Sequence, residues 1–473
     1  MQTIEKNLHR QNDTNQSILS QISLPIQLTG RPVCGKNVAI DFNGGNVTSD
    51  AGVLLLSEIE NQIGLIDSLS ACIQDSRRSY SVDHSINDLF AQRIYQISCG
   101  YEDANDSNSL RKDPALKMAL DRLPVQEDDL ASQPTISRLE NQVTEKELAK
   151  MKDVFINQFI SSYDKEPELI VLEFDDTNHT VHGQQQESLF NGYYGEYCFM
   201  PLHVYEGISG KFITAILRPG KRSAGKETEG HLKSIVKQIR AHWPNTIIVF
   251  RGDGHFSSPE VFDYIESQEN MYSITGLTGN NVLQKQAQTT IDSAKRLYKD
   301  TQRKIKLYHS FFYQAGSWDC KRRVVVKVEM SERGLNVRYI STDMYQAKTR
   351  SLYEDIYCAR GNMELMIKDH KTYTKSDRTS CHSFHANQFR LFLHSAAYVL
   401  LHHLRTQVLK GTELSKATFE TLRLRLLKIG GRVVELKTKI KIHLPNAYPY
   451  KFILKKCFDI FDHLRRTDTI RLC

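Results

Sequence analysis

Hydrophobic residues recur at helical spacing through the first third of the chain, and this pattern predicts a group of amphipathic helices. From residue 49 to 123 the pattern is helical, and Ser49 or Asp50 can cap the run AGVLLLSEIENQIGLI. One face of a second run carries Ile86, Leu89, Phe90, Ile94 and Ile97. A further helix is expected to begin near Pro134, behind a serine cap, in SQPTISRLENQV. Its residues 135–138 could form the tip of a DNA-reading helix, but a plain bundle helix is the favoured interpretation.

Short, β-rich apolar runs replace the helical pattern at Leu169. The runs expected to form strands are ELIVLEF at 168–174, YCFMPLHVYE at 197–206, KFITAILRP at 211–219 and NTIIVF at 245–250. Residues 207–210 would turn the second strand into the third, and an amphipathic helix is predicted over 231–240. The order strand, hairpin, helix, strand predicts a mixed α/β sheet.

Two further segments follow this sheet. Residues 280–350 are predicted to be a β-rich insertion, in which RRVVVKVEM and LNVRYIST flank a hairpin turn at Ser331–Gly334. From Ser351 the pattern is helical again, with a core helix at 396–405 and a basic tail behind it.

Composition excludes several classes of protein. The chain has 473 residues, of which 40% are hydrophobic and 25% charged, the balance of a soluble globular protein. Its apolar runs are too short to span a membrane, and the N-terminus lacks the apolar segment of a secretory signal. Nine cysteines, none of them spaced as CxxC, argue against a disulfide framework or a zinc finger and for reduced thiols in a cytosol.

The positive charge is concentrated at the C-terminal end. Residues 405–473 contain 16 Lys and Arg against 6 Asp and Glu, a net charge of +10, whereas the rest of the chain carries −3. Such a tail is typical of a partner that is a polyanion, most often nucleic acid. A solvated basic surface explains the charge alone equally well.

Two aspartates lie where strands of the predicted sheet end. Asp175 ends ELIVLEF, and Asp253 follows NTIIVF in RGDGHF. Carboxylates at the carboxyl ends of neighbouring strands converge where such sheets place their sites. A single Asp after a strand is more often a turn former, so the pair is suggestive without being decisive.

A third carboxylate lies in a more specific pattern. YCARGNMELMIKDHK places Tyr357, Arg360, Glu364 and Lys371 in the spacing Y-x2-R-x3-E-x6-K. At 100° per residue these four side chains would form one stripe of a helix. A surface stripe with pairs of Glu364 to Arg360 and Lys368 is the simpler explanation of the bare pattern.

Taken together, these residues resemble bacterial insertion-sequence transposases of the DDE class with the Y-x2-R-x3-E-x6-K signature, and among them the IS "thirteen-eighty" group. The shared segments are DFNGGNVTSDAGVLLL, SQPTISRLEN, the D-x-T of Asp175 and Thr177, HGQQQESLFNGYYGEYCFMPLHVYE, RGDGHF, YCARGNMELMIK and ANQFRLFLHSAAYVLL. They run in order from about residue 38 to 430. The adjacent Asp176 leaves an ambiguity that the D-x-T register resolves in favour of Asp175.

The resemblance implies an α/β fold with a ribonuclease-H-like mixed-sheet catalytic core. Its expected regions are a flexible lead-in (1–35), a mostly helical DNA-binding region (36–160), the catalytic core with its insertion (161–405) and a basic helical C-terminal region (406–473). The matching acidic residues, Asp175, Asp253 and Glu364, would be both catalytic and metal-binding. The implied enzyme binds the terminal inverted repeats of its own element, cleaves the strands and joins them to target DNA.

The chemistry of the acidic residues agrees with that activity. Two Mg²⁺ ions, for which Mn²⁺ may substitute, stabilise the attacking and leaving oxygens of phosphoryl transfer, and hard cations require carboxylate oxygens. Arg360 and Lys371 would hold phosphates, and Tyr357 would contact the transferred strand end. Lys221, Arg222 and Lys226 are expected to contact the DNA backbone.

Other classes of function remain open. A catalytically inactive, sequence-specific DNA-binding protein is the first alternative. A P-loop NTPase is the second, because GKRSAGKETEG nearly matches the phosphate loop, although Glu227 stands where the loop needs a hydroxyl. A zinc site at CHSFH (381–385) lacks a second ligand pair. We expect self-association in a synaptic complex, no membrane partner, and a cytoplasmic, nucleoid-associated bacterial protein.

Overall fold

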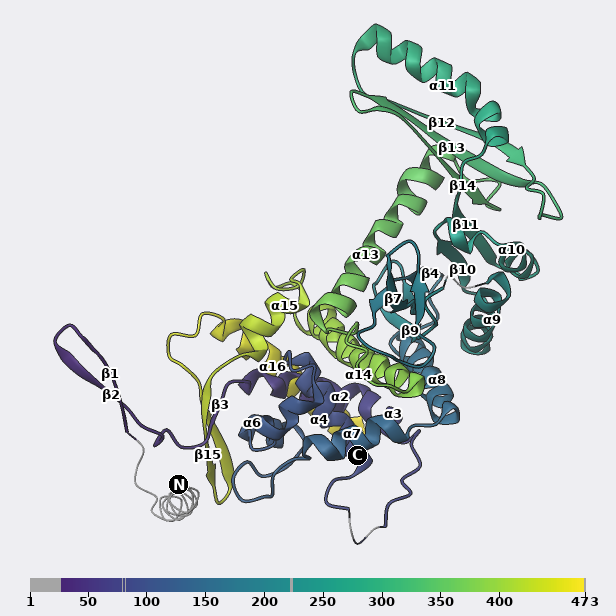
Figure 1. Ribbon diagram of the computed structural model, residues 1–473. Coiled ribbons are helices and arrows are strands. Elements are labelled where there is room, and N and C mark those ends of the chain that lie inside the picture. The colour runs from purple at the N-terminus through teal and green to yellow at the C-terminus, as the bar shows by residue number, and fades with distance from the viewer. Residues whose placement is uncertain (1–26, 79, 81, 222–223, 472–473) are drawn as a thin grey trace, which may run out of the picture.

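The computed structural model describes residues 27–78, 80, 82–221 and 224–471 (Figure 1). A helical body, a central mixed sheet and a projecting insertion follow one another in space (Figure 1). Most of the predicted lead-in, residues 1–26, lies outside the described residues, as does Arg222. No helix of the described ranges is long and apolar enough to cross a membrane.

The central sheet has eight strands in the order β12-β13-β14-β11-β10-β4-β8-β9. The five strands that form its core are β4 (Leu169–Asp176), β8 (Leu202–Glu206), β9 (Phe212–Ile216), β10 (Ile247–Gly252) and β11 (Met271–Leu277). Strands β4, β10 and β11 are parallel to one another. Strand β8 is antiparallel to both of its neighbours, β4 and β9. The mixed α/β sheet predicted from the apolar runs is confirmed.

The run at 197–206 was expected to be one strand and forms two. β7 (Glu196–Phe199) ends before Met200-Pro201, and β8 begins after it. Proline has no N–H to donate to a ladder, so it separates strands that enter different sheets. β7 pairs with β5 (His179–Thr180) and β6 (Leu189–Asn191) in a small sheet beside the end of β4.

Helices cover both faces of the central sheet. One face packs on α8 (Glu145–Ser161), α9 (Gly225–His242) and α10 (Pro259–Glu266), whose apolar side chains share a core with β4 and β10. Helix α9 therefore begins six residues before the predicted 231. The other face packs on the π-helical segment η5 (Leu352–Tyr357).

The insertion extends the sheet, and its β content is confirmed. β12 (Ile305–Tyr313), β13 (Arg322–Ser331) and β14 (Gly334–Thr342) are antiparallel, and the hairpin turn lies at Ser331–Gly334 as predicted. The expectation missed α11 (Asn281–Thr301), which covers these strands (Figure 1). Its buried stripe consists of Leu283, Ala287, Ile291 and Ala294. Two of these four are alanines in a strongly polar segment, so the apolar pattern is weak.

A continuous helical run then returns from the insertion to the helical body (Figure 1). Its segments are α12 (Thr349–Ser351), η5, η6 (Cys358–Arg360), α13 (Gly361–Lys368) and η7 (Asp369–Tyr373). We call residues 349–373 the signature helix. Because η5 and η7 are π-helical and η6 is 3-10, the uniform 100° spacing assumed from the sequence is wrong here.

The helical body combines the first third of the chain with its C-terminal third. The N-terminal elements are β3 (Val47–Thr48), η1 (Ala51–Val53), α2 (Leu54–Ile63), α3 (Leu65–Ser70), α4 (Ile86–Ser98), η3 (Ala104–Asp106), α5 (Ser107–Leu110), α6 (Pro114–Ala119) and α7 (Gln133–Gln142). The C-terminal helices are α14 (Phe384–His403), η8 (Leu404–Val408), α15 (Phe419–Leu422), η9 (Arg423–Leu427) and α16 (Lys451–Arg471). Both groups share one hydrophobic core.

Two sequence expectations at the chain ends need correction. The tail was expected to be helical, but β15 (Gly431–Leu436) and β16 (Lys439–His443) form a hairpin that pairs with β3. The lead-in was expected to be flexible to residue 35, but β1 (Leu28–Val33) and β2 (Lys36–Ile40) form a hairpin. Alternating lysines and isoleucines in KIKIH have strand periodicity, which the charge count alone did not reveal.

A buried ionic cluster joins three helices of the body. The Oε1 and Oε2 atoms of Glu140 on α7 accept from Arg93 Nε on α4 at 3.3 Å and from Arg390 Nη1 on α14 at 3.1 Å. All three side chains are at most 5% exposed. One carboxylate thus bridges two buried guanidinium groups.

We expect Glu140→Ala to lower the free energy of unfolding by about 3–5 kcal/mol, because both guanidinium groups would stay buried without a counter-ion. Glu145→Ala, at an exposed position of α8, is the control and should cost less than about 1 kcal/mol. Urea unfolding followed by circular dichroism measures both. An equal effect of the two substitutions would show that the cluster is not a stabilising centre.

Candidate active site

Asp175 and Asp253 lie at the same edge of the central sheet. Asp175 is near the end of β4, and Asp253 directly follows β10, its parallel neighbour. Successive side chains of a strand alternate between faces. Asp175 therefore shares the face of Val171, which packs against the signature helix, whereas Asp176 shares the face of Phe174 and helices α9 and α10.

Arg360 of the signature helix contacts Asp175. Its Nη2 lies 2.8 Å from Asp175 Oδ2, and the two side chains are 20% and 13% exposed. Burial raises the pKa of Asp175 to about 6 against the opposing effect of Arg360, and the negative charges of Asp253 and Asp176 act in the same direction as burial. Asp175 therefore sits in a cluster of like charges that Arg360 partly neutralises.

His255 bridges Asp176, at the end of β4, and Asp253, which follows β10. Its Nε2 is 3.0 Å from Asp176 Oδ2, and its Nδ1 is 2.5 Å from Asp253 Oδ1. Burial alone would lower the pKa of His255, but the bonds to Asp176 and Asp253 outweigh it and raise that pKa to about 9. His255 is thus an imidazolium at neutral pH. Arg218 Nη2 adds a second cation, 2.8 Å from Asp176 Oδ2.

Two other signature residues also reach the strand ends. Lys371 Nζ donates to the Asn178 carbonyl at 2.5 Å, to Asn178 Oδ1 at 3.1 Å and to Thr177 Oγ1 at 3.3 Å. The Tyr357 hydroxyl lies against Gly276, where a Cβ would come within 2.7 Å of it. Burial raises the pKa of Tyr357 and lowers that of Lys371. Arg360 and Tyr357 therefore lie near the two aspartates, whereas Lys371 binds the segment that follows β4.

Glu364 is the signature residue that the structure does not bring into this group. It lies one helical turn beyond Arg360, and its side chain is exposed. Among the described residues it forms no salt bridge, so the simple surface pairs with Arg360 and Lys368 are not present either. Its role as third metal ligand stays a prediction.

The donor set fits a divalent cation in part. Asp175 and Asp253 supply carboxylate oxygens, the ligands that Mg²⁺ prefers, and their mutual repulsion is the charge pattern that a cation relieves. In the part of the chain that the structure describes, no three His, Cys, Asp or Glu side chains are close enough together to hold a metal ion. Asp175 and Asp253 share a sheet edge and Glu364 lies outside it, and the metal-binding role of all three stays a prediction.

Arg251 and Glu173 are a supporting pair that sequence reasoning missed. Arg251 Nη2 lies 2.7 Å from Glu173 Oε2, both side chains are at most 3% exposed, and Arg251 Nη1 donates to the Ile356 carbonyl at 2.8 Å. Burial raises the pKa of Glu173 to about 7 although Arg251 opposes the shift. The pair holds the signature helix against β4 and β10. Arg251 and His255 both flank Asp253 in RGDGHF, so the motif itself was the available signal.

Of the remaining basic candidates, Lys221 follows β9 and Lys226 lies in the first turn of α9. Lys221 and Lys226 are exposed, whereas Arg222 is outside the described residues. Glu227 occupies the first turn of α9 and lies 3.9 Å from Arg218 Nη1. A carboxylate at this helix N-terminus would repel a phosphate, which argues against the P-loop alternative.

The segment proposed and rejected as a zinc site makes structural bonds instead. His382 Nδ1 is 3.0 Å from the Gln184 carbonyl, and the Cys381 N–H donates to Asn387 Oδ1. These contacts fasten the start of α14 to the segment after β5.

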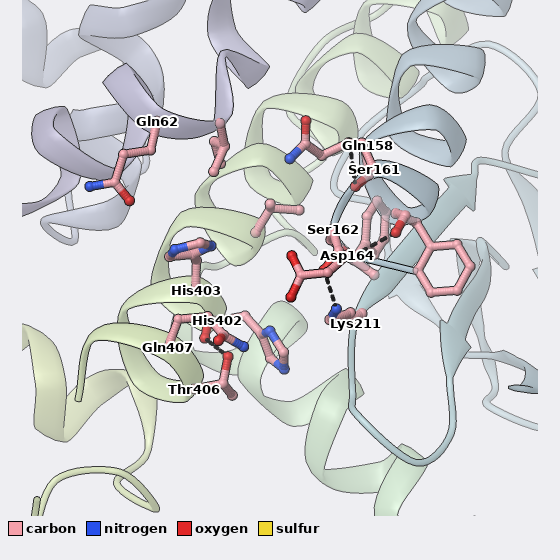
Figure 2. Close-up of a pocket in the computed structure, with 14 residues that line it drawn as sticks. Gln62, Gln158, Ser161, Ser162, Asp164, Lys211, His402, His403, Thr406 and Gln407 are labelled. Carbon is pink, nitrogen blue, oxygen red and sulfur yellow. Dashed lines mark hydrogen bonds between the residues drawn. The ribbon is translucent and has the colours of Figure 1, made fainter. Parts of the chain in front are cut away.

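A separate cavity of about 500 Å³ lies away from the aspartates, where α2, α8, β9 and α14 meet (Figure 2). Its polar lining includes Lys211, whose Nζ donates to the Ser162 carbonyl at 2.8 Å (Figure 2). It also includes His402, whose Nε2 is 3.1 Å from the Ser209 carbonyl. Burial lowers the pKa of His402 to about 3 and that of His403 to about 4. Both rings are therefore neutral parts of the interior.

Comparison with known proteins identifies the class. The chain belongs to the family described as Transposase DDE domain group 1, whose model matches residues 31–466. It is therefore a transposase with a DDE domain, an enzyme of DNA transposition. A search of the curated proteins finds no match. Among solved structures, it is similar to the piggyBac transposase in a synaptic complex with hairpin DNA, at a TM-score of 0.40 and 12% identity over 80% of each chain.

We expect Asp176→Asn to lower the pKa of His255 from about 9 by roughly one unit or more, because one of its two carboxylate partners loses its charge. NMR titration of the His255 ring in EDTA measures this, and Asp292→Asn, exposed on α11, is the control. A pKa raised above the unfolded value stabilises the fold below about pH 6.5, and the stabilisation, up to about 3 kcal/mol, is lost as pH rises through 9. A His255 pKa near 6.5 in the unsubstituted protein would contradict the bridge.

Proposed function

We propose that this transposase binds the terminal inverted repeats of an insertion sequence, cleaves them with divalent metal ions and joins the ends to target DNA. The observation that carries the proposal is that Asp175 and Asp253 lie at one edge of the sheet beside Arg360 and Tyr357, with Lys371 bound to the segment that follows Asp176. The order β9-β8-β4-β10-β11, in which β8 alone runs opposite to the other four strands, supports a ribonuclease-H-like core. The motif matches support the IS "thirteen-eighty" group.

In this proposal Asp175 and Asp253 hold the metal ions, and Glu364 completes the set. When bound, two Mg²⁺ ions supply charge stabilisation for the attacking and leaving oxygens of the phosphate. Arg360 then turns from Asp175 to a phosphate oxygen, for which its planar guanidinium is suited. Lys371 fixes the segment that follows Asp175, and Tyr357 lies where it can hydrogen-bond the strand end.

Glu364 requires a movement of the signature helix toward the sheet. It is exposed and lies one turn from Arg360, which already contacts Asp175. The π-helical segments on either side interrupt the α-helical pattern, and such interruptions are frequent at functional sites. DNA that draws Arg360 away from Asp175 would open the carboxylate to this movement.

The basic hairpin of β15 and β16 is proposed to contact the DNA backbone. Lys437, Lys439 and Lys441 are exposed on it, and Lys439 and Lys441 lie on the same face of β16. Phosphate contacts of this kind position DNA without selecting sequence. We further propose that two copies assemble on paired ends in a bacterial cytoplasm.

The decisive experiment is cleavage of linear DNA that carries the element ends. With Mg²⁺ or Mn²⁺ the protein should nick the end boundaries, and Glu364→Gln should reduce the cleavage rate by about a hundredfold or more while leaving end binding intact. Glu354→Gln, on the same helix but paired with Arg350, is the matched control. Cleavage that persists in EDTA, or full activity of Glu364→Gln, would exclude the proposed mechanism.

The adjacent aspartates provide an internal control for that experiment. We expect Asp175→Asn to be inactive and Asp176→Asn to keep at least partial activity, because only Asp175 faces the signature helix. The reverse result would move the first ligand by one residue without changing the class of enzyme. End binding without cleavage in the unsubstituted protein would instead favour the inactive DNA-binding alternative.

Replacing Lys437, Lys439 and Lys441 with Gln should weaken binding of end DNA and random DNA about equally. Each lost phosphate contact lowers the slope of log K against log salt by about 0.9, so the slope should fall by up to about 3. Lys146→Gln with Lys150→Gln, exposed on α8, is the control. A loss confined to end DNA would show that the hairpin recognises bases.

A further inference from the structure

A small hairpin beside the active site exposes an aromatic surface. Phe190 on β6 and Tyr197 on β7 are directly opposite each other, with ring centroids 5.6 Å apart. Their side chains are 58% and 57% exposed, and Tyr193 in the connecting turn is 82% exposed. Aromatic side chains usually bury most of their surface, so three exposed on one hairpin suggest a partner. We call residues 189–199 the aromatic hairpin.

One edge of the aromatic hairpin is tied to the active site. Glu196 Oε1 accepts from Asn178 Nδ2 at 2.7 Å and from Thr180 Oγ1 at 2.8 Å. Asn178 in turn accepts from Lys371 Nζ and lies two residues after Asp176. The hairpin is therefore held at a fixed offset from the aspartates, and its own carboxylate is occupied by Asn178 and Thr180.

The other edge is tied to the basic segment between β9 and α9. Asn191 Nδ2 donates to the Gly220 carbonyl at 3.0 Å. A Cβ at Gly220 would lie 2.4 Å from the Cys198 carbonyl oxygen and 2.6 Å from that of Leu189, so only glycine permits this approach. Lys221, which follows directly, is exposed. A cation is thus positioned beside the aromatic surface.

We infer that the aromatic hairpin binds unpaired nucleobases of the DNA strand whose phosphate enters the active site. Every base has an aromatic face that can stack on Phe190 or Tyr197, and Lys221 is placed to neutralise an adjacent phosphate. A duplex offers such faces only where its bases are unpaired, so the surface would favour DNA opened near the cleavage point. This inference rests on the proposed function for the identity of the DNA.

The test compares fully paired end DNA with the same DNA carrying several unpaired terminal nucleotides, by fluorescence anisotropy in EDTA. The unsubstituted protein should prefer the unpaired form, and Phe190→Ala with Tyr197→Ala should weaken that binding about tenfold while changing duplex binding less than about twofold. Phe190→Tyr with Tyr197→Phe should restore the preference, because both rings remain. Phe452→Ala, 85% exposed on α16, is the control and should have no effect.

Several results would overturn the inference. They are no preference for unpaired DNA, an equal loss on both DNA forms, or a change of molecular mass in sedimentation that identifies the surface as a contact between copies. Because EDTA removes the metal ions needed for cleavage, the measured affinities report DNA binding alone. A preference that depends on the two rings, without metal-dependent cleavage, would leave this inference standing and exclude the proposed function. Metal-dependent cleavage together with ring substitutions that do not change binding would support the proposed function and exclude this inference.

Discussion

Repulsion between neighbouring carboxylates at one edge of the sheet is the constraint on which the rest of the site depends. Asp175, Asp176 and Asp253 are brought together by two parallel strands, and partial burial makes each of their charges costly. Arg360 comes from a helix that follows the insertion, and Arg218 and His255 come from loops at the ends of strands. Three separate segments of the chain therefore place a cation beside these carboxylates.

Asp175 and Asp176 lie on opposite faces of β4, and different cations neutralise them. On one face, Asp175 contacts Arg360 of the signature helix. On the other face, Asp176 is fixed by Arg218 and His255 among packed helices. His255 joins the two parts because its second nitrogen contacts Asp253. The cations on the two faces therefore come from different parts of the fold, Arg360 from the signature helix and Arg218 and His255 from the ends of β9 and β10.

The sequence predicted the elements whose apolar pattern was strong and the residues that lie in contiguous motifs. The strands around Asp175 and Asp253 follow from ELIVLEF and NTIIVF, and the turn at Ser331–Gly334 was placed correctly. Helix α11 was missed because its buried stripe is half alanine. The tail hairpin was missed because its segment was interpreted from its net charge and not from the alternation of lysine and isoleucine in KIKIH. The contacts of Arg251 with Glu173 and of His255 with Asp176 required three-dimensional information, since these partners are 78 and 79 residues apart in the sequence.

The signature helix couples the insertion to the chemistry. It begins directly after β14, whose partner β11 is next to β10, and it passes Arg360 and Lys371 across the end of β4 before α14 starts. Arg251 fixes its first half by donating to the Ile356 carbonyl, and Asn178 fixes its last turn through Lys371. Glu364 lies between these two fixed points, in the short α-helical stretch flanked by non-α segments. The helical type changes on both sides of Glu364, so this exposed carboxylate does not follow the single stripe that uniform α-helical spacing predicts for the four signature residues.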